Sequence, residues 1–85
     1  MQIEYSKKFQ KQFKKCPKKI KKKCIDNLAV FSEDPNHPLL RKHALTGKYR
    51  GCYSINLGGD WRIIFDEDKE GISILGIGTH SQLYK

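Results

Sequence analysis

The sequence predicts a small α+β domain: an N-terminal strand and a helical hairpin, then a curved, mostly antiparallel sheet of three or four strands. Three observations predict this fold. The chain has 85 residues, enough for one hydrophobic core but not for two. Apolar residues recur at helical spacing up to about residue 31, and they alternate at strand spacing after residue 42. Turn residues separate the alternating segments. We therefore expect residues 1–85 to form a single domain of this class.

The first element is expected to be a short strand that leads directly into a helix. Residues 2–5 (QIEY) alternate apolar and polar side chains, and Ser6 is a typical helix N-cap. Phe9, Phe13 and Cys16 follow at spacings of four and three, so they lie on one helix face. The lysines between them would form the outer face.

The second helix begins after Pro17, which ends the first helix and can occupy the first turn of the next. Its apolar stripe consists of Ile20, Cys24, Ile25, Leu28 and Phe31. We expect both helical cysteines to pack in the core as small apolar residues. The three cysteines of the chain are an odd number without CxxC spacing, so neither a disulfide framework nor a zinc site is expected. No other cofactor is expected.

Positive charge is concentrated in the first third of the chain. The net charge is +8, and residues 1–33 carry ten lysines against three acidic residues, whereas residues 34–85 are nearly neutral. This distribution predicts an anionic partner, and a nucleic acid or an acidic protein is favoured over a membrane surface. A solvated helix face without any partner is the simpler alternative.

The same composition predicts a cytoplasmic protein without a membrane span. No apolar run approaches the roughly 20 residues that cross a bilayer, and the N-terminus lacks the apolar region of an export signal. An odd number of cysteines without paired spacing fits a reducing compartment.

Four segments after the helices are expected to be strands. They are 42–45 (KHAL), 48–57 (KYRGCYSINL), 60–66 (DWRIIFD) and 72–80 (ISILGIGTH). The two-proline connector before them places His37 in a loop. For the first long hairpin we expect a three-residue loop at 57–59 with a glycine in the left-handed region.

That loop pairs odd-numbered residues with odd-numbered residues and so decides which side chains face the helices. The helix side would hold Tyr49, Tyr53, Ile55, Leu57, Trp61, Ile63 and Phe65. The last strand is ambiguous: if Leu75 and Ile77 face the helices, then Gly76, Gly78 and His80 face the other way. The two glycines mark either close approach by a ligand or a bulge or tight packing contact.

The face away from the helices is expected to be polar. It collects Arg50, Ser54, Asn56, Asp60, Arg62 and His80, and His43 can join them from the preceding segment. These groups suit cleavage of RNA without a metal, in which the 2′-hydroxyl needs a base, the leaving 5′-oxygen an acid and the phosphorane positive charge. Exposed polar strand faces are common, so composition alone also allows a surface without catalytic function.

The segment HALTGKYRGCYSINLGGDWRIIF (43–65), followed by IGTHSQLYK (77–85), resembles the RelE/ParE toxin superfamily of bacterial toxin–antitoxin modules. Within it, the resemblance is closest to the YafQ-type messenger-RNA endonucleases and extends over nearly the whole chain. It implies the fold expected above and ribosome-dependent cleavage of messenger RNA in the ribosomal A site. It also implies a cognate antitoxin that wraps the toxin, with operator DNA bound only through the antitoxin complex.

The resemblance further implies roles for individual residues. His80 corresponds to the catalytic histidine and is taken as the general acid. His43 corresponds to a second histidine that serves as base or orients the phosphate, and Asp60 to an acidic residue that serves as base or histidine partner. Contacts to RNA or phosphate are expected from Arg62, Arg50, Tyr84 and Asn56, and docking on the 70S ribosome from Lys14, Lys18, Lys19 and Lys22.

One departure and two alternatives accompany this interpretation. Where some YafQ-type members carry a further histidine, this chain has Asn56, which can hydrogen-bond but cannot transfer a proton. The first alternative is a ParE-like toxin that inhibits DNA gyrase without cutting RNA. Such toxins share the fold but lack the histidine set. The second is a non-catalytic basic module that binds ribosomal RNA or a protein.

Overall fold

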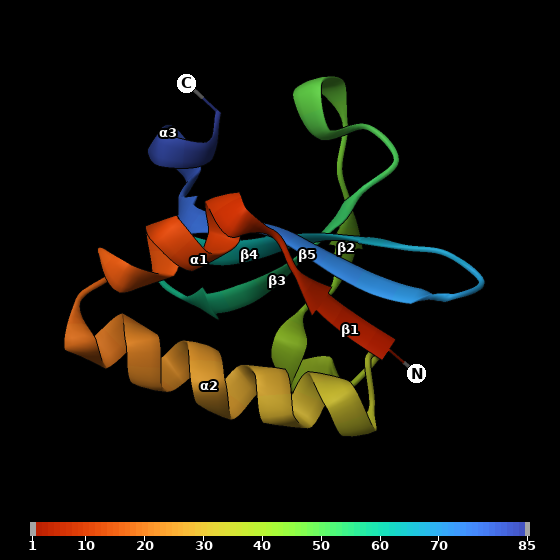
Figure 1. The fold of residues 1–85 in the computed structure, drawn as a ribbon, viewed down its shortest axis with the longest axis horizontal. Coiled ribbons are helices and arrows are strands. Elements are labelled where there is room, and N and C mark those ends of the chain that lie inside the picture. Colours follow the sequence, from red (N-terminus) through yellow and green to blue (C-terminus); the bar gives the residue numbers. More distant parts are fainter. Residues whose placement is uncertain (1, 85) are drawn as a thin grey trace.

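The computed structural model describes residues 2–84 as a five-stranded mixed sheet with three α-helices (Figure 1). The strand order is β1-β5-β4-β3-β2; β1 pairs with β5 in parallel, and the other pairs are antiparallel. The elements along the chain are β1 (Gln2–Tyr5), α1 (Lys7–Lys14), α2 (Lys18–Glu33), the 3-10 turn η1 (Pro38–Leu40), β2 (His43–Ala44), the 3-10 turn η2 (Gly47–Tyr49), β3 (Tyr53–Gly58), β4 (Trp61–Glu67), β5 (Gly71–Thr79) and α3 (His80–Leu83). The predicted α+β class and order are confirmed.

Helix α2 lies across one face of the sheet and forms the main core with it (Figure 1). The rings of Phe31 on α2 and Phe65 on β4 meet edge to face at 4.8 Å. Cys16 and Cys24 are buried in this core, as predicted. The prediction for Ile25 is wrong, because its side chain is 60% exposed. One residue along a helix is a rotation of about 100°, which carries Ile25 out of the stripe that continues from Cys24.

Helix α1 lies along the part of β5 that extends beyond the short strand β1 (Figure 1). Three hydrogen bonds join it to β5: Ser6 N to the Ile74 carbonyl at 3.0 Å, Ser6 Oγ to the Leu75 carbonyl at 3.1 Å, and Ile77 N to Gln12 Oε1 at 3.0 Å. The Ser6 hydroxyl also caps α1, as predicted. Backbone groups at the free edge of β5 are therefore satisfied without another strand.

The hairpin between β3 and β4 has the predicted side-chain parity but a different turn. Ile55 lies opposite Ile63, so odd residues pair with odd residues. The turn itself is Gly59–Asp60, and Leu57 is an extra residue in a bulge between two pairs of the ladder. Gly58 and Gly59 have φ values of 103° and 54°, which glycine adopts readily. The predicted three-residue loop at 57–59 is therefore wrong.

Strand β3 begins at Tyr53, five residues later than predicted. Residues 47–49 form η2, and the backbone turns again at Gly51. Gly47 and Gly51 have φ values of 64° and 92°, which interrupt an extended strand. Tyr49 consequently packs on the face away from α2, so its predicted position on the helix side is wrong.

A bulge in β5 resolves the ambiguity of the last strand. Ile64 pairs with Gly76 whereas Phe65 pairs with Ile74, so Leu75 is the extra residue. The apolar residues on both sides of the bulge therefore enter the main core, namely Ile72, Ile74 and Ile77. Leu75 lies on the opposite face, in a second cluster whose buried members are Leu45, Ile64 and Leu83.

Gly76 and Gly78 of β5 make room for protein groups. A Cβ atom at Gly78 would lie 2.9 Å from Gln82 Oε1, and one at Gly76 would lie 3.1 Å from Gln12 Oε1. A larger side chain at either position would displace these glutamine oxygens, which accept hydrogen bonds from Thr79 N and Ile77 N. Of the two explanations that the sequence allowed, tight packing is the one observed. No described helix is long and apolar enough to cross a bilayer.

A buried hydrogen bond between α2 and the sheet gives a test of this packing. Asn27 is 4% exposed, and its Nδ2 donates to the carbonyl of Asn56 at 3.0 Å. Asn27→Ala leaves that carbonyl without its partner, and we expect a loss of about 1–3 kcal/mol in the free energy of unfolding, measured by urea denaturation.

The neighbouring substitution Asp26→Ala is the matched control. It removes only an exposed ion pair with Lys22 at 3.5 Å, so the free energy of unfolding should change by less than about 0.5 kcal/mol. Equal losses for the two variants would contradict the assigned role of Asn27.

Candidate active site

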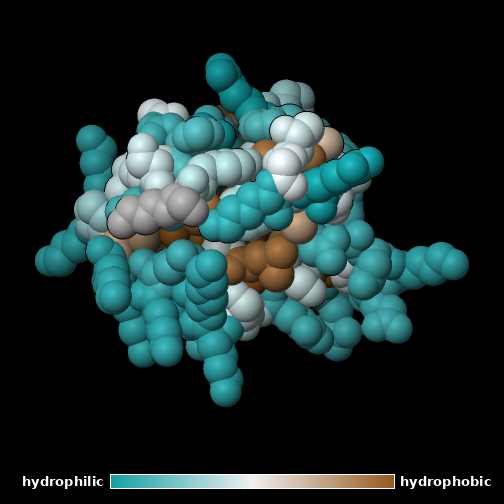
Figure 2. Space-filling model, turned by 90° about the horizontal axis from the view of Figure 1, so that it is seen from above, coloured by the Kyte–Doolittle hydropathy of each residue, from teal (hydrophilic) through white to brown (hydrophobic). Residues whose placement is uncertain are grey.

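The sheet face opposite α2 carries most of the predicted site residues. Helix α3 and the segment 45–52 rise above this face (Figure 1). Figure 2 looks down on it and shows long hydrophilic side chains around the rim, with a small hydrophobic area near the centre. The face is not wholly polar, because Ile64, Leu75 and Leu83 pack together there.

Asp60 and His80 are neighbours at one end of this face. The backbone N–H of His80 donates to the Asp60 carbonyl at 3.2 Å. This contact arises because Trp61 pairs with Thr79 at the end of the β4–β5 ladder, so that the residues just outside the pair also meet. The backbones of Asp60 and His80, which are distant in the sequence, therefore lie side by side.

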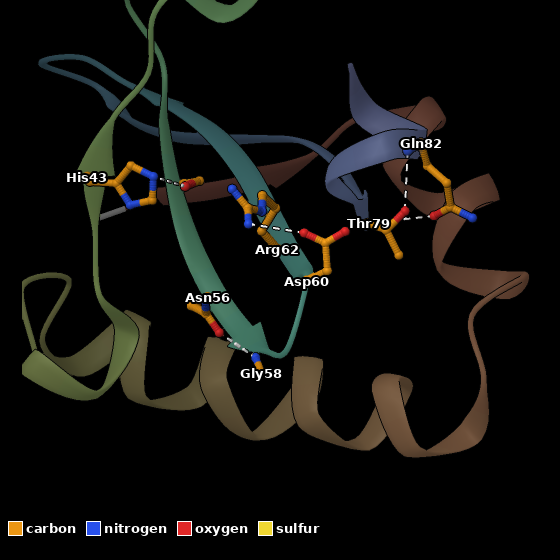
Figure 3. Close-up of polar contacts among 8 residues, drawn as sticks. His43, Asn56, Gly58, Asp60, Arg62, Thr79 and Gln82 are labelled. Atoms are coloured by element: carbon orange, nitrogen blue, oxygen red, sulfur yellow. Dashed lines mark hydrogen bonds and ion pairs between the residues drawn. The ribbon is translucent and has the colours of Figure 1, made fainter. Parts of the chain in front are cut away.

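Arg62 extends this pair toward the middle of the sheet. It lies opposite Gly78, and its Nη2 is 3.5 Å from Asp60 Oδ1 (Figure 3). The side chain is 20% exposed, and its Nε is buried without a hydrogen-bond partner among the described residues. A buried donor without a partner costs stability. A bound anion would supply the missing acceptor for this donor.

The one-turn helix α3 fixes the position of His80. Thr79 Oγ1 accepts from Gln82 N at 3.2 Å, and Gln82 Oε1 accepts from Thr79 N at 3.0 Å, which is a capping box (Figure 3). The rings of His80 and Tyr84 stack at 4.5 Å with an interplanar angle of 21°. The helical turn therefore places Tyr84 beside His80.

His43 lies apart from this cluster, on edge strand β2, with β3 between it and Arg62 (Figure 3). Three inter-strand spacings separate β2 from β5, or about 14 Å. His43 Nδ1 is 3.2 Å from the Arg41 carbonyl, which can only accept a hydrogen bond. In the neutral ring Nδ1 therefore carries the proton, and Nε2 accepts from Ser54 Oγ at 3.3 Å. The neutral ring thus has its lone pair on Nε2.

A cavity of about 390 Å³ adjoins His43 at the β2 edge. The basic side chains that line it are His37, Arg41, Lys42 and His43. Lys42 is paired with Glu67 at 2.6 Å. His37 lies in the connector, as predicted, and its Nδ1 accepts from Leu39 N at 3.1 Å. No motif marks Arg41 or Lys42 as a site residue, because Arg41 lies in the connector and Lys42 is only the first residue of the expected strand 42–45.

Two predicted phosphate contacts have other positions. Arg50 is exposed in the turn that follows η2 and lies outside β3, so its predicted place on the strand beside Arg62 is wrong. The side-chain oxygen of Asn56 accepts a hydrogen bond from the backbone N–H of Gly58 at the hairpin bulge (Figure 3). Asn56 thus supports the turn through its side-chain oxygen. Its amide nitrogen is the side-chain group that can donate to a phosphate.

The four lysines predicted to dock on the ribosome lie together at the corner between α1 and α2. Lys14 is the last residue of α1, and Lys18, Lys19 and Lys22 belong to the first turns of α2. All four are exposed. The first turn of α2 contains no acidic residue. Lys22, in the next turn, forms an exposed ion pair with Asp26 at 3.5 Å.

Buried thiols make cysteine chemistry unsuitable for this site. Burial raises the pKa of Cys24 to about 12, with nearby Cys16 a lesser cause. Burial also raises the pKa of Cys16, partly offset by Lys21, and that of Cys52, where Asp66 adds to the effect. A protonated thiol is a poor nucleophile and metal ligand. Within residues 2–84, no group of three or more His, Cys, Asp or Glu side chains is arranged to hold a metal ion.

Comparison with known proteins gives one family and several similar structures. The family model described as "Bacterial toxin of type II toxin-antitoxin system, YafQ" matches residues 1–85. The crystal structure of YafQ from E. coli strain BL21(DE3) superposes with a TM-score of 0.85 at 22% identity, covering 99% of this chain and 98% of that one.

Two further structures have the same fold. A chain of the E. coli DinJ-YafQ complex gives a TM-score of 0.73 at 24% identity, covering 99% of this chain and 98% of that one. A YoeB/ParE toxin from Agrobacterium tumefaciens gives 0.76 at 13% identity, with 94% and 99% covered. At such identities the similarity establishes the fold alone. No curated protein sequence gives a significant match.

The raised pKa of Cys24 predicts how this thiol reacts. At pH 8 a thiol of pKa about 12 is roughly one part in ten thousand thiolate, against about one part in ten at the reference value of 9.0. In the native protein, iodoacetamide should therefore label half-buried Cys52 before Cys24, as followed by mass spectrometry. Labelling of Cys24 at the rate of Cys52 would contradict the assignment.

The same shift has a consequence for stability. The unfolded thiol ionises near pH 9 and the folded one near 12. The contribution of Cys24 to the free energy of unfolding is therefore complete below pH 9 and is lost as the pH rises toward 12.

Proposed function

Because the chain belongs to the YafQ family of type II toxin–antitoxin toxins, we propose that it is a single-domain, ribosome-dependent endoribonuclease that cuts messenger RNA in the A site. The observation that carries the proposal is the backbone hydrogen bond that joins Asp60 to His80, beside the Arg62 guanidinium, whose Nε is buried without a hydrogen-bond partner among the described residues. A carboxylate, an imidazole and a cation within one small area are the groups that metal-independent cleavage of RNA requires.

In the proposed reaction the 2′-oxygen of one nucleotide attacks the adjoining phosphorus. Asp60 takes the 2′-hydroxyl proton, and the bond from phosphorus to the 5′-oxygen breaks as the new bond forms. Protonated His80 donates its proton to the leaving 5′-oxygen. Arg62 stabilises the negative charge of the phosphorane. The products are a 2′,3′-cyclic phosphate and a 5′-hydroxyl end.

His43 is assigned to the neighbouring part of the RNA strand. Asp60 adjoins His80 directly, whereas β2 is about 14 Å from β5. Asp60 is therefore the nearer base for a phosphate held between Arg62 and His80. The basic residues around the cavity beside His43 suit a following phosphate group. Tyr84, stacked on His80, offers an aromatic ring at the reacting nucleotide.

The lysines at the start of α2 support an anionic partner such as ribosomal RNA. A helix N-terminus carries partial positive charge, so each cation there is unfavourable by about 0.3–1 kcal/mol. Lys18 and Lys19 nevertheless occupy the first two positions of α2. This arrangement does not favour the helix itself, and the phosphate groups of docked RNA would compensate it.

The remaining partners follow from the proposed class of toxin. The E. coli protein named YafQ has been solved in complex with DinJ, and a toxin–antitoxin complex implies a second chain that neutralises the toxin. We assign to this chain a cognate antitoxin, operator contacts made only through that complex, and action in the cytoplasm, where ribosomes and messenger RNA are found.

Substitution of His80 tests the reaction. His80→Gln keeps a hydrogen-bonding side chain but cannot transfer a proton, so cleavage of ribosome-bound messenger RNA should fall by about 10²–10⁴-fold. Induced without antitoxin, the variant should no longer arrest growth. Lys69→Gln, which changes an exposed residue in the turn between β4 and β5, should cleave as the unaltered protein does.

Mapping of messenger-RNA 5′ ends after induction decides between the candidate functions. New ends that carry a 5′-hydroxyl support the endoribonuclease. Growth arrest with chromosome damage and no new ends would favour inhibition of DNA gyrase. Equal cleavage with and without ribosomes would refute the dependence on ribosomes.

The docking role of the lysine corner predicts a change in salt dependence. If Lys18 contacts a phosphate, Lys18→Gln should reduce the slope of log binding constant against log salt by about 0.7–0.9, measured on 70S ribosomes. Lys69→Gln removes the same charge from the exposed turn between β4 and β5 and should leave the slope unchanged. Identical slopes in the two variants would exclude a specific contact at Lys18.

A further inference from the structure

The C-terminal end of α3 is held by residues from a distant loop. Tyr49 Oη donates to the Leu83 carbonyl at 2.8 Å, and Lys48 Nζ donates to the same carbonyl at 3.3 Å. Carbonyl groups in the last turn of a helix have no partner within the helix. Helix α3 has only four residues, and such a short helix is not stable by itself. Its conformation therefore depends on groups outside it.

The same loop contacts the aromatic ring that stacks on His80. Tyr49 meets Tyr84 edge to face, with ring centroids 5.2 Å apart and an interplanar angle of 85°. The Tyr84 ring also stacks on the His80 ring at 4.5 Å. Edge-to-face and stacked pairs both depend on ring orientation. A change in the position of Tyr49 is thus transmitted through one ring to the imidazole.

A small apolar cluster fixes the loop and the helix to the same part of the sheet. Leu45, Ile64 and Leu83 are buried together, and Tyr49 and Tyr84 pack against them. The loop is closed at its base by a hydrogen bond from Leu45 N to the Cys52 carbonyl at 3.0 Å. The loop is therefore a defined structure, able to hold another element in place.

The opposite end of α3 is held independently. The capping box and the bond from His80 N to the Asp60 carbonyl fix the backbone where α3 begins. They do not contact the imidazole ring, whose described ring contact is the stack on Tyr84. Orientation of the ring is consequently controlled from the C-terminal end of the helix.

We propose that Tyr49 is a positioning residue, which orients the imidazole of His80 through Leu83 and Tyr84. The proposal rests on the proposed function in one respect, namely that His80 transfers a proton. A group that acts as an acid must reach the leaving oxygen at hydrogen-bond distance, and a displacement of about 1 Å can cost about 100-fold in rate. The loop 45–52 is then part of the catalytic apparatus without touching the reacting atoms.

The decisive experiment compares Tyr49→Phe with Tyr5→Phe, each in the full chain. Tyr49→Phe keeps the ring and its packing but removes the donor to Leu83. Tyr5 lies on β1 and stacks near Phe9, so the same chemical change there is the control. The ring resonances of the three histidines are recorded by NMR without RNA and assigned with His37→Gln, His43→Gln and His80→Gln.

In Tyr49→Phe we expect the chemical shifts of the His80 ring to change, because the ring is no longer held in its stack on Tyr84. The chemical shifts of the His37 and His43 rings should stay the same. We also expect kcat on ribosome-bound messenger RNA to fall by about 10- to 100-fold with KM unchanged. Tyr5→Phe should change neither quantity. A folded Tyr49→Phe protein whose His80 resonances and kcat are unaltered would overturn the proposal.

A second variant guards against misfolding. Lys48→Gln leaves every ring in place, and it should shift the same His80 resonances, though less than Tyr49→Phe does. No movement in this variant would limit the positioning role to Tyr49. Because the spectra require no RNA, a chain that fails to cut messenger RNA would refute the proposed function and leave the test of Tyr49 intact.

Discussion

The pairing of β4 with β5 is the constraint on which the rest of this structure depends. The bulge at Leu75 shifts the register by one residue, so that apolar side chains before and after it enter the same core. Helix α1 packs along the edge of β5 that β1 leaves free, and α3 packs on the face of β5 away from α2. At the end of the ladder the turn residue Asp60 meets His80. The core, both flanking helices and the candidate site are therefore consequences of a single strand register.

Most of the fold could be predicted from local sequence because its determinants are local. Ser6 is a good cap, Pro17 separates two helical stripes, and alternation marks the strands. The errors lie where a single residue shifts the strand register, so that later side chains face the other side of the sheet, or where it turns the backbone. The bulges at Leu57 and Leu75 each add a residue to one strand only, and no composition rule distinguishes such a residue from its neighbours.

The candidate site was predictable in its residue types and less so in its grouping. The sequence placed Asp60, Arg62 and His80 on one face, and the structure brings these three together. The sequence does not show that His43 lies at a distance from these three residues, because that distance depends on the order of the strands in the sheet. It also placed Arg50 on a strand, since the glycines at 47 and 51 gave no measure of how far the chain turns there. Tyr49 was assigned to the core for the same reason.

The second apolar cluster lies on the face away from α2 and is much smaller than the main core. Its three buried residues contrast with twelve in the main core. Small clusters open at lower free energy than the whole domain, so amide hydrogen exchange should be fastest in α3 and the loop 45–52. Heating would disorder the segment that carries His80 before the core melts. The thermal limit of activity would then lie below the thermal limit of the fold.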